Sequence, residues 1–320
     1  MVDAAPAAEW QKTLRPGKTV SIDGTTIAYE VLGEGTKTLL LANGLGGRLY
    51  AWQPLIDKFW RTHRLITWDY RGLFDSATVA TGSRRLALSH HVEDAEAILR
   101  AESVGRAVLI GWSMGVQVSL DVAATSPELV AGLVLINGTY GHVLQTGFQP
   151  LFAVPFLPKR LHAVIEFLQK HPELAKTLTT VTRLFELPTA AALRVALGSR
   201  SKDVRPLLRR YYDDVLGPSF PNYMRLFQEL DAHSVYHLLP YIQTPALVIS
   251  GKFDVLTPAF QSHEIARRLP NATHLRLKRA SHFAMIERPG DVIPEIERFL
   301  ELRARFDPES SSAPAAQPRR

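Results

Sequence analysis

The sequence has no cysteine among its 320 residues. This absence excludes disulfide bonds, thiolate metal sites, iron–sulfur clusters and cysteine nucleophiles. The sequence also lacks a run of about 18 apolar residues, the length that a membrane-spanning helix needs. Residues 1–18 show no basic start followed by an apolar core, so no signal peptide is expected. We therefore expect a cytoplasmic protein without stable membrane insertion, while transient contact with a lipid surface stays open.

Basic residues are in modest excess, with a formal net charge of +6. They are spread along the chain, and no basic run is interleaved with aromatic residues as in a single-strand nucleic-acid binder. The chain is 46% hydrophobic and 21% charged, which is typical of a globular protein with a large core. We expect a small-molecule partner and no nucleic acid; the oligomeric state is left open.

Short apolar runs alternate with segments of helical periodicity. This alternation predicts an α/β fold with a mostly parallel, doubly wound sheet that is covered by helices on both faces. Residues 19–32 are expected to form a leading hairpin at the edge of the sheet. The other predicted strands are 38–43, 63–69, 107–111, 132–137, 246–251 and 273–279, and the predicted helices are 51–60, 91–103, 260–269 and 292–305.

One long segment interrupts this alternation. After the strand at 132–137, about a hundred residues of helical character precede the next buried strand, and structureless loops of that length are uncommon. We expect residues 139–240 to form an inserted helical cap on a core made of residues 19–138 and 241–306. Residues 1–18 are expected to be flexible, and the Pro-, Ser- and Ala-rich residues 307–320 to be disordered.

A serine stands where a buried strand gives way to a helix, in Gly111-Trp112-Ser113-Met114-Gly115. The pattern G-x-S-x-G in this context is the nucleophile elbow, a tight turn that projects the serine Oγ above the sheet. The two glycines remove side chains that would collide in such a turn. A serine hydroxyl is a weak nucleophile unless a base takes its proton and a third group orients that base. The motif therefore predicts an acid and a histidine downstream.

Both residues follow predicted strands. Asp254 comes three residues after the strand at 246–251, and His282 follows the strand at 273–279. The order Ser, Asp, His along the chain is the one found in enzymes that carry this kind of nucleophile elbow. The end of the strand at 132–137 is a rival position for the acid, but it carries Asn137 and offers no carboxylate.

The loop Asn43-Gly44-Leu45-Gly46-Gly47 follows the strand at 38–43 and is rich in glycine. Such a loop lets backbone amides turn toward an oxygen. We expect the N–H groups of Leu45 and Met114 to form an oxyanion hole, in which each donor contributes roughly 3 kcal/mol.

These motifs resemble those of the α/β-hydrolases, in particular the cap-bearing serine esterases and lipase-like enzymes, over roughly residues 20–305. The resemblance also includes Asp69-Tyr70-Arg71-Gly72. It implies a Ser113–His282–Asp254 triad, an oxyanion hole at Leu45 and Met114, a helical cap that forms the acyl or alcohol pocket, and no cofactor.

Two positions depart from the family pattern. Asn43 stands where the family usually has histidine, and Phe74 replaces the second glycine of D-x-R-G-x-G-x-S. The first change bears on the order of the oxyanion loop and the second on how the neighbouring loop closes. Neither removes a catalytic atom.

Trp112, His142 and Phe283 are candidate substrate-binding residues. His142 comes just after the strand at 132–137 and is expected to line the entrance of the cap, and Trp112 and Phe283 adjoin catalytic positions. Adjacent histidines such as His90 and His91 are a poor metal site, since both cannot face one ion from a helix. No metal is therefore expected. Tyr211 is assigned to the core of the cap, with the pocket wall as the alternative.

The sequence thus predicts a serine hydrolase that cleaves a carboxylic ester with a substantial apolar part. Relatives that use aspartate at the elbow, such as haloalkane dehalogenases and epoxide hydrolases, are excluded because Ser113 stands there. Two alternatives remain: a carbon–carbon bond hydrolase of ring-fission products, and a non-catalytic small-molecule-binding protein of the same fold. The substrate's chain length and stereochemistry are left open.

Overall fold

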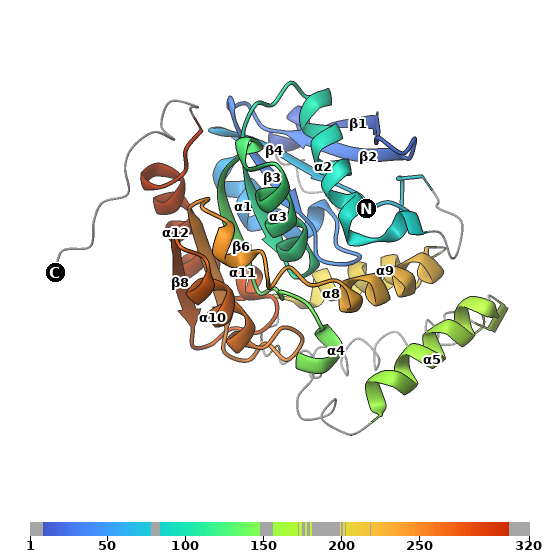
Figure 1. Cartoon of the computed structure of the whole chain (residues 1–320). Helices are drawn as coiled ribbons and strands as arrows, with labels where there is room; N and C mark the ends of the chain where they lie inside the picture. The colour runs from blue at the N-terminus through green and yellow to red at the C-terminus, as the bar shows by residue number, and fades with distance from the viewer. Residues whose placement is uncertain are drawn as a thin grey trace, which may run out of the picture.

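The structure, a computed structural model, describes residues 9–77, 84–147, 156–171, 173–174, 177, 180, 199, 201, 203–217 and 219–306. Its centre is an eight-stranded sheet in the order β1-β2-β4-β3-β5-β6-β7-β8 (Figure 1). The pairs β1–β2 and β2–β4 are antiparallel and all others are parallel. The strands are β1 (Arg15–Val20), β2 (Thr26–Leu32), β3 (Lys37–Ala42), β4 (His63–Trp68), β5 (Ala107–Trp112), β6 (Val130–Ile136), β7 (Ala246–Gly251) and β8 (Ala272–Leu277).

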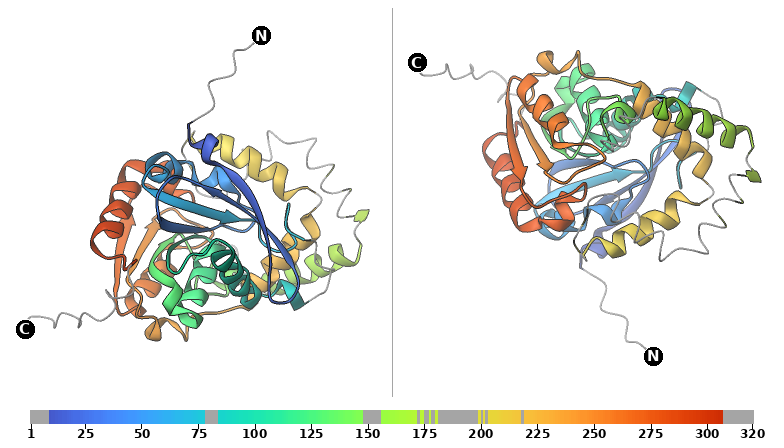
Figure 2. Two further views of the ribbon diagram at one scale, coloured as in Figure 1. Left: turned by 90° about the horizontal axis from the view of Figure 1, so that it is seen from above. Right: turned by 90° about the horizontal axis from the view of Figure 1, so that it is seen from below.

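Helices cover both faces of the sheet, as Figure 2 shows from above and below. Burial on both faces explains why β5, β6 and β7 are continuous apolar runs without polar alternation. One face carries α2 (Leu88–Ala101), α3 (Met114–Thr125) and α10 (Ala259–Arg268), and the other carries α1 (Gln53–Phe59), α11 (Ala284–Glu287) and α12 (Pro289–Leu302). The mostly parallel, doubly wound α/β architecture is confirmed.

Four described helices lie between β6 and β7 in the chain, and we refer to them as the inserted helices. They are α4 (Val143–Thr146), α5 (Leu157–Lys170), α8 (Arg205–Val215) and α9 (Phe220–Ala232). In Figure 1 they lie at one end of the sheet, below the strands. The segment 181–198 of the expected cap lies outside the described residues.

Short 3₁₀ helices complete the described elements: η1 (Glu9–Thr13), η2 (Leu49–Trp52), η3 (Arg84–Leu86), η4 (Pro127–Leu129) and η6 (Leu239–Tyr241). Within the described part of the chain, no helix has the length and apolar character needed to cross a bilayer.

The N-terminal segment differs from the expectation of flexibility over residues 1–18. Residues 9–18 form η1 and most of β1, and β1 pairs with β2 along its whole length, from Arg15 opposite Val31 to Val20 opposite Thr26. The hairpin predicted at the sheet edge is present, but its first strand begins at Arg15 instead of residue 19. Its start is hard to predict because "RPGKTV" has little apolar character: it is an edge strand with an exposed face, where proline is tolerated. Residues 1–8 and 307–320 lie outside the described residues.

The strand order indicates where a site can form. From β3 the chain passes to β4 on one side of β3, and the later β5 pairs with its other side. The loops that leave the carboxyl ends of β3 and β5 therefore run in opposite directions, and in open parallel sheets a crevice forms at such a point. The loop of Leu45 and the turn of Ser113 are the two loops concerned.

Candidate active site

Ser113 occupies the turn between β5 and α3 in a strained backbone conformation, with φ 57° and ψ −116°. A non-glycine residue held there costs about 1–3 kcal/mol. The neighbouring glycines leave no room for a side chain: a Cβ on Gly111 would lie 2.3 Å from the Gly115 carbonyl oxygen, and one on Gly115 would lie 1.9 Å from the Ala42 carbonyl oxygen. Both glycines are therefore required for α3 to approach β3 and β5 this closely.

His282 and Asp254 are hydrogen-bonded, with 2.9 Å between His282 Nδ1 and Asp254 Oδ2. Both side chains are buried, at 4% and 1% exposure. The Asp254 carboxylate also accepts hydrogen bonds from the backbone N–H groups of Leu256 and Thr257, each at 2.9 Å, and from the Thr257 hydroxyl at 2.8 Å. A carboxylate with this many donors is fixed in position and can orient the imidazole through Nδ1.

Asn137 holds this acid in place, a role that sequence analysis missed. Its amide nitrogen donates to Asp254 Oδ2 at 2.8 Å and to the Ser281 carbonyl at 2.5 Å, while its amide oxygen accepts from the Gly251 N–H at 3.2 Å. One side chain thus joins the ends of β6 and β7 and the loop of His282. The signal in the sequence is its position directly after a buried strand, which the sequence analysis treats only as a possible place for a carboxylate.

Trp112 contacts both the loop that carries His282 and the glycine-rich loop after β3. Its indole N–H donates to the His282 carbonyl at 3.0 Å, and its ring lies 5.7 Å from that of Phe283. A Cβ on Gly44 would approach the Trp112 ring to 2.8 Å, so the loop after β3 lies directly on the indole. Trp112 therefore supports both the histidine loop and the glycine-rich loop.

Asn43, which stands where the family usually has histidine, fixes the start of the glycine-rich loop. Its amide nitrogen donates to the Trp68 carbonyl at 2.7 Å, and its amide oxygen accepts from the Trp52 indole N–H at 2.6 Å. Its own carbonyl accepts from the Tyr70 hydroxyl at 2.6 Å. The amide of Asn43 therefore ties β3 to β4 and η2, and the loop is ordered without a histidine.

The glycine-rich loop and the start of α3 provide backbone donors near Ser113. Met114 is the first residue of α3, and N–H groups in the first turn of a helix have no partner within that helix. Leu45 is buried, and the turn that contains it is closed by a hydrogen bond from the Gly47 N–H to the Gly44 carbonyl at 2.8 Å. Both predicted oxyanion donors therefore lie on the loops that border the crevice between β3 and β5.

A cavity of about 390 Å³ opens above these residues, and Ser113 and His282 both line it. Leu45, Trp112 and Phe283 line it as well. Its walls are mainly hydrocarbon and come largely from the inserted helices. The apolar lining residues contributed by α4, α5 and α9 are Val143, Leu161, Ile165, Met224, Phe227 and Leu230.

The remaining predicted residues have different places. His142 lies at the N-terminal end of α4 in a left-handed conformation, with φ 55°, and is not among the described residues that line the cavity. Tyr211 does line the cavity, whereas its neighbour Tyr212 is buried in the core. His91 is fully buried against the ring of Tyr70, with 4.8 Å between ring centroids. Burial lowers the pKa of His91 well below its ordinary value.

Phe74 stands where the family has glycine and has a positive φ of 49°, a conformation that glycine adopts more readily than phenylalanine. The Arg48 guanidinium lies 4.7 Å from the centroid of the Phe74 ring. The backbone N–H of Phe74 donates at 3.3 Å to the hydroxyl of Ser219, which lies just before α9. The loop after β4 is thus closed onto the inserted helices by a phenylalanine in a strained conformation.

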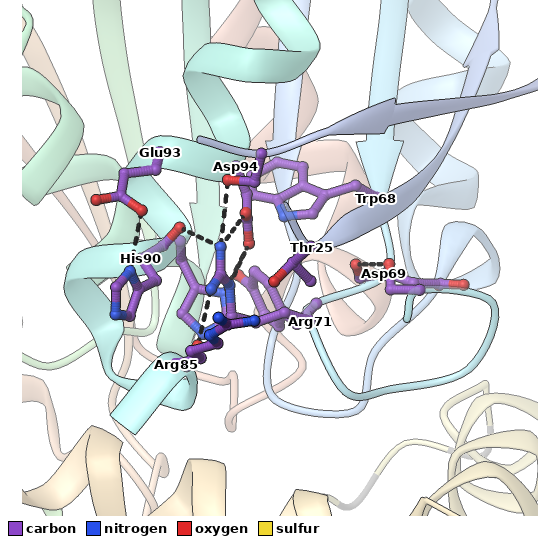
Figure 3. Close-up of polar contacts among 12 residues, drawn as sticks. Thr25, Trp68, Asp69, Arg71, Arg85, His90, Glu93 and Asp94 are labelled. Carbon is purple, nitrogen blue, oxygen red and sulfur yellow. Dashed lines mark hydrogen bonds and ion pairs between the residues drawn. The ribbon is translucent and has the colours of Figure 1, made fainter. Parts of the chain in front are cut away.

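Arg71, in the same loop, is a fully buried cation whose hydrogen bonds join four segments (Figure 3). It binds Asp94 through Nε at 2.8 Å and Nη2 at 2.5 Å, and Asp23 through Nη1 at 2.9 Å. It also donates to the carbonyls of Arg85 at 2.8 Å and His90 at 3.2 Å. Arg71 therefore anchors the loop to α2 and to the β1–β2 hairpin, a structural role.

Asp69, at the head of this loop, gives the protein a specific pH dependence. Burial raises the pKa of Asp69 to about 6, against the opposing effect of Arg48. Because the folded-state pKa lies above the unfolded value of about 3.9, the folded protein binds the proton more tightly, and this contribution to stability is lost as the pH rises from about 4 to 6.

Replacing Asp69 by asparagine, which stays neutral, is expected to remove this loss. The difference in free energy of unfolding between Asp69→Asn and wild type should change by about 2–3 kcal/mol in favour of the variant as the pH is raised from 4 to 7. Urea unfolding at a series of pH values measures this difference. Parallel pH profiles for the two proteins would contradict the assignment.

Comparison with known proteins identifies the family of the fold. The alpha/beta hydrolase fold family matches residues 37–289. The chain is 24% identical over 288 residues to a pimeloyl-[acyl-carrier protein] methyl ester esterase of Aliivibrio salmonicida, covering 88% of this chain and 98% of the relative. It is 28% identical over 267 residues to a putative carbamate hydrolase RutD of Pseudomonas syringae pv. syringae, covering 83% and 94%.

The fold of the chain is likewise similar to that of solved hydrolases. A structure of an esterase from Exiguobacterium antarcticum superposes with a TM-score of 0.69 at 16% sequence identity, covering 89% of this chain and 98% of that one. The sequence match extends over more than half of the chain and includes the turn of Ser113, Asp254 and His282. The chain belongs to the α/β hydrolase fold family.

Proposed function

We propose that the protein is a serine hydrolase that cleaves carboxylic esters with an apolar acyl or alcohol part. The observation that carries the proposal is the convergence of Ser113, in its strained turn, and the hydrogen-bonded His282–Asp254 pair on one apolar cavity. Family membership supports the hydrolase class.

In the proposed mechanism, His282 takes the proton of Ser113 Oγ through Nε2 as the oxygen attacks the ester carbonyl. Asp254 accepts the hydrogen bond from Nδ1, fixes the tautomer and stabilises the imidazolium that forms. The N–H groups of Leu45 and Met114 stabilise the negative charge on the carbonyl oxygen. His282 then donates its proton to the leaving alcohol, and a water molecule activated by His282 hydrolyses the acyl-enzyme.

The lining of the cavity supports a substrate with a hydrocarbon chain. Burial of one CH₂ group in such a site contributes about 0.8 kcal/mol, which is close to fourfold in kcat/KM when the group is fully enclosed in the transition state. A carboxylate in the same place would lose its hydration against hydrocarbon walls, which is unfavourable unless a cation compensates.

The test is a series of 4-nitrophenyl esters from acetate to decanoate, assayed with the purified full chain. We expect kcat/KM to rise with chain length until the cavity is filled. The 4-nitrophenyl monoester of adipic acid should be a poorer substrate than the hexanoate, which has the same acyl chain length.

Two outcomes would overturn the proposal. Hydrolysis of a vinylogous 1,5-diketone ring-fission product without turnover of any ester would assign the site to carbon–carbon bond hydrolysis. Binding of the esters without turnover would assign it to a non-catalytic protein. The cytoplasmic location, the lipid-surface contact and the division into a core and a cap stay predictions.

A further inference from the structure

The geometry points to Tyr211 and Tyr223 as positioning residues that fix the oxyanion loop through a directional chain of two hydroxyl groups. This inference rests on the proposed function, because it assigns a role to the Leu45 N–H. The two tyrosines belong to different inserted helices, α8 and α9. The two hydroxyl groups thus link α8 and α9 to the loop that follows β3.

Two hydrogen bonds form the chain. The Tyr211 hydroxyl donates to the Leu45 carbonyl, and the hydroxyl oxygens of Tyr211 and Tyr223 lie 3.1 Å apart. A carbonyl only accepts, and a phenol has one hydrogen. Tyr211 therefore uses its hydrogen for Leu45, and the bond between the phenols must run from Tyr223 to Tyr211. Its direction is thus fixed without reference to any observed hydrogen atom.

Both hydroxyl groups stay protonated at neutral pH, as the two hydrogen bonds require. Burial raises the pKa of Tyr211 well above its ordinary value and also raises that of Tyr223. Hydrogen bonds in series polarise one another, so the bond to Leu45 is stronger when Tyr223 donates to Tyr211.

Packing restrains the same loop from two sides. Gly46 has φ +77°, and a Cβ there would lie 2.8 Å from the Tyr223 ring and 3.0 Å from Val215 of α8. On the opposite side, Gly44 lies on the Trp112 ring. The hydroxyl chain therefore acts on a loop held between the inserted helices and the strand that leads to Ser113. The Leu45 N–H shares its peptide plane with the Gly44 carbonyl, which accepts from the Gly47 N–H at 2.8 Å. The Leu45 carbonyl belongs to the next plane and accepts from Tyr211, so the two hydrogen bonds restrain the planes on both sides of the Leu45 Cα and with them the direction of its N–H.

The test compares Tyr211→Phe, Tyr223→Phe and the double variant with wild type in steady-state hydrolysis of the ester series. Removal of a whole oxyanion donor lowers kcat by about 10²–10³. Tyr211→Phe displaces the donor without deleting it, so we expect a smaller loss of about tenfold in kcat. The factor should be the same for every chain length, with little change in KM. Tyr223→Phe should lose less, and the double variant should equal Tyr211→Phe, because Tyr223 acts only through Tyr211.

A transition-state-like ligand gives a second measurement. An alkyl boronic acid adds to a serine Oγ as a tetrahedral anion, so its inhibition constant should rise by the same factor as kcat/KM falls in Tyr211→Phe. Tyr236→Phe is the matched control, since it removes a phenol hydroxyl that donates to Glu264 at 2.9 Å, away from the cavity. Its kcat and boronate affinity should equal those of wild type.

Three results would overturn the inference. The first is a kcat of Tyr211→Phe within twofold of wild type. The second is an effect of Tyr211→Phe that appears as a higher KM and varies with acyl chain length, as expected of a residue that only lines the cavity. The third is a double variant whose loss in kcat is the sum of the two single losses in free energy. If Tyr211→Phe does not fold, Tyr223→Phe carries the same comparison. Failure of the proposed function is separate: it would appear as undiminished turnover by a variant that lacks the Ser113 hydroxyl.

Discussion

Ser113→Ala is expected to lower kcat for ester hydrolysis by about 10⁶-fold, the loss found when the nucleophile of a serine triad is removed. The cause is that no other group in the proposed mechanism can form the acyl-enzyme. The residual rate should exceed the uncatalysed one by roughly 10³–10⁴, because the oxyanion donors and the cavity remain. Single-turnover and steady-state assays with a nitrophenyl ester measure both rates.

The fold of Ser113→Ala should be unchanged, since alanine has the same backbone preferences and the glycines that shape the turn remain. Ser119→Ala is the matched control. Ser119 is also buried on α3 but does not line the cavity, so its replacement should leave kcat at the wild-type value. Wild-type turnover by Ser113→Ala would remove the basis of the mechanism.

Arg71→Met is expected to cause the largest loss of stability, about 3–5 kcal/mol. Methionine fills much of the same space but leaves the Asp94 carboxylate without its guanidinium partner, whereas Asp23 keeps an ion pair with Arg85 at 3.9 Å. Asp94 is 0% exposed, so its charge is not compensated by water. A natural protein has only about 5–15 kcal/mol of stability, and we expect the midpoint of thermal unfolding to fall by roughly 5–15 °C.

The double variant Arg71→Met/Asp94→Leu separates the two contributions. Removing both charges avoids the unpaired buried carboxylate, so the double variant should be more stable than Arg71→Met. Calorimetry of wild type and the two variants measures these differences. An Arg71→Met protein within about 1 kcal/mol of wild type would show that water or local rearrangement replaces the guanidinium.

The sheet could be predicted because its strands are buried on both faces. Such strands appear in the sequence as uninterrupted apolar runs, and the predicted strand at 246–251 coincides with β7. The start of β1 could not be predicted in the same way, because this strand lies at an edge and is held by backbone pairing with β2. Backbone hydrogen bonds leave little trace in residue type.

The candidate site divides along similar lines. Ser113, Asp254 and His282 are identifiable because each follows a strand that sequence can predict and carries the chemistry that the mechanism needs. Asn137 and Tyr211 are not, since each acts by binding a backbone carbonyl that is far away in the sequence. Asn137 and Ser281 are 144 positions apart, and Tyr211 and Leu45 are 166 positions apart. Only the folded chain brings these groups together.

The most direct test of the Ser113–His282–Asp254 assignment is covalent labelling with a fluorophosphonate, which reacts with serines activated by a neighbouring base. We expect one label per folded chain, located at Ser113 by mass spectrometry of the peptides. Labelling should be lost in His282→Ala and after denaturation. Labelling of another residue, or equal labelling of folded His282→Ala, would contradict the account.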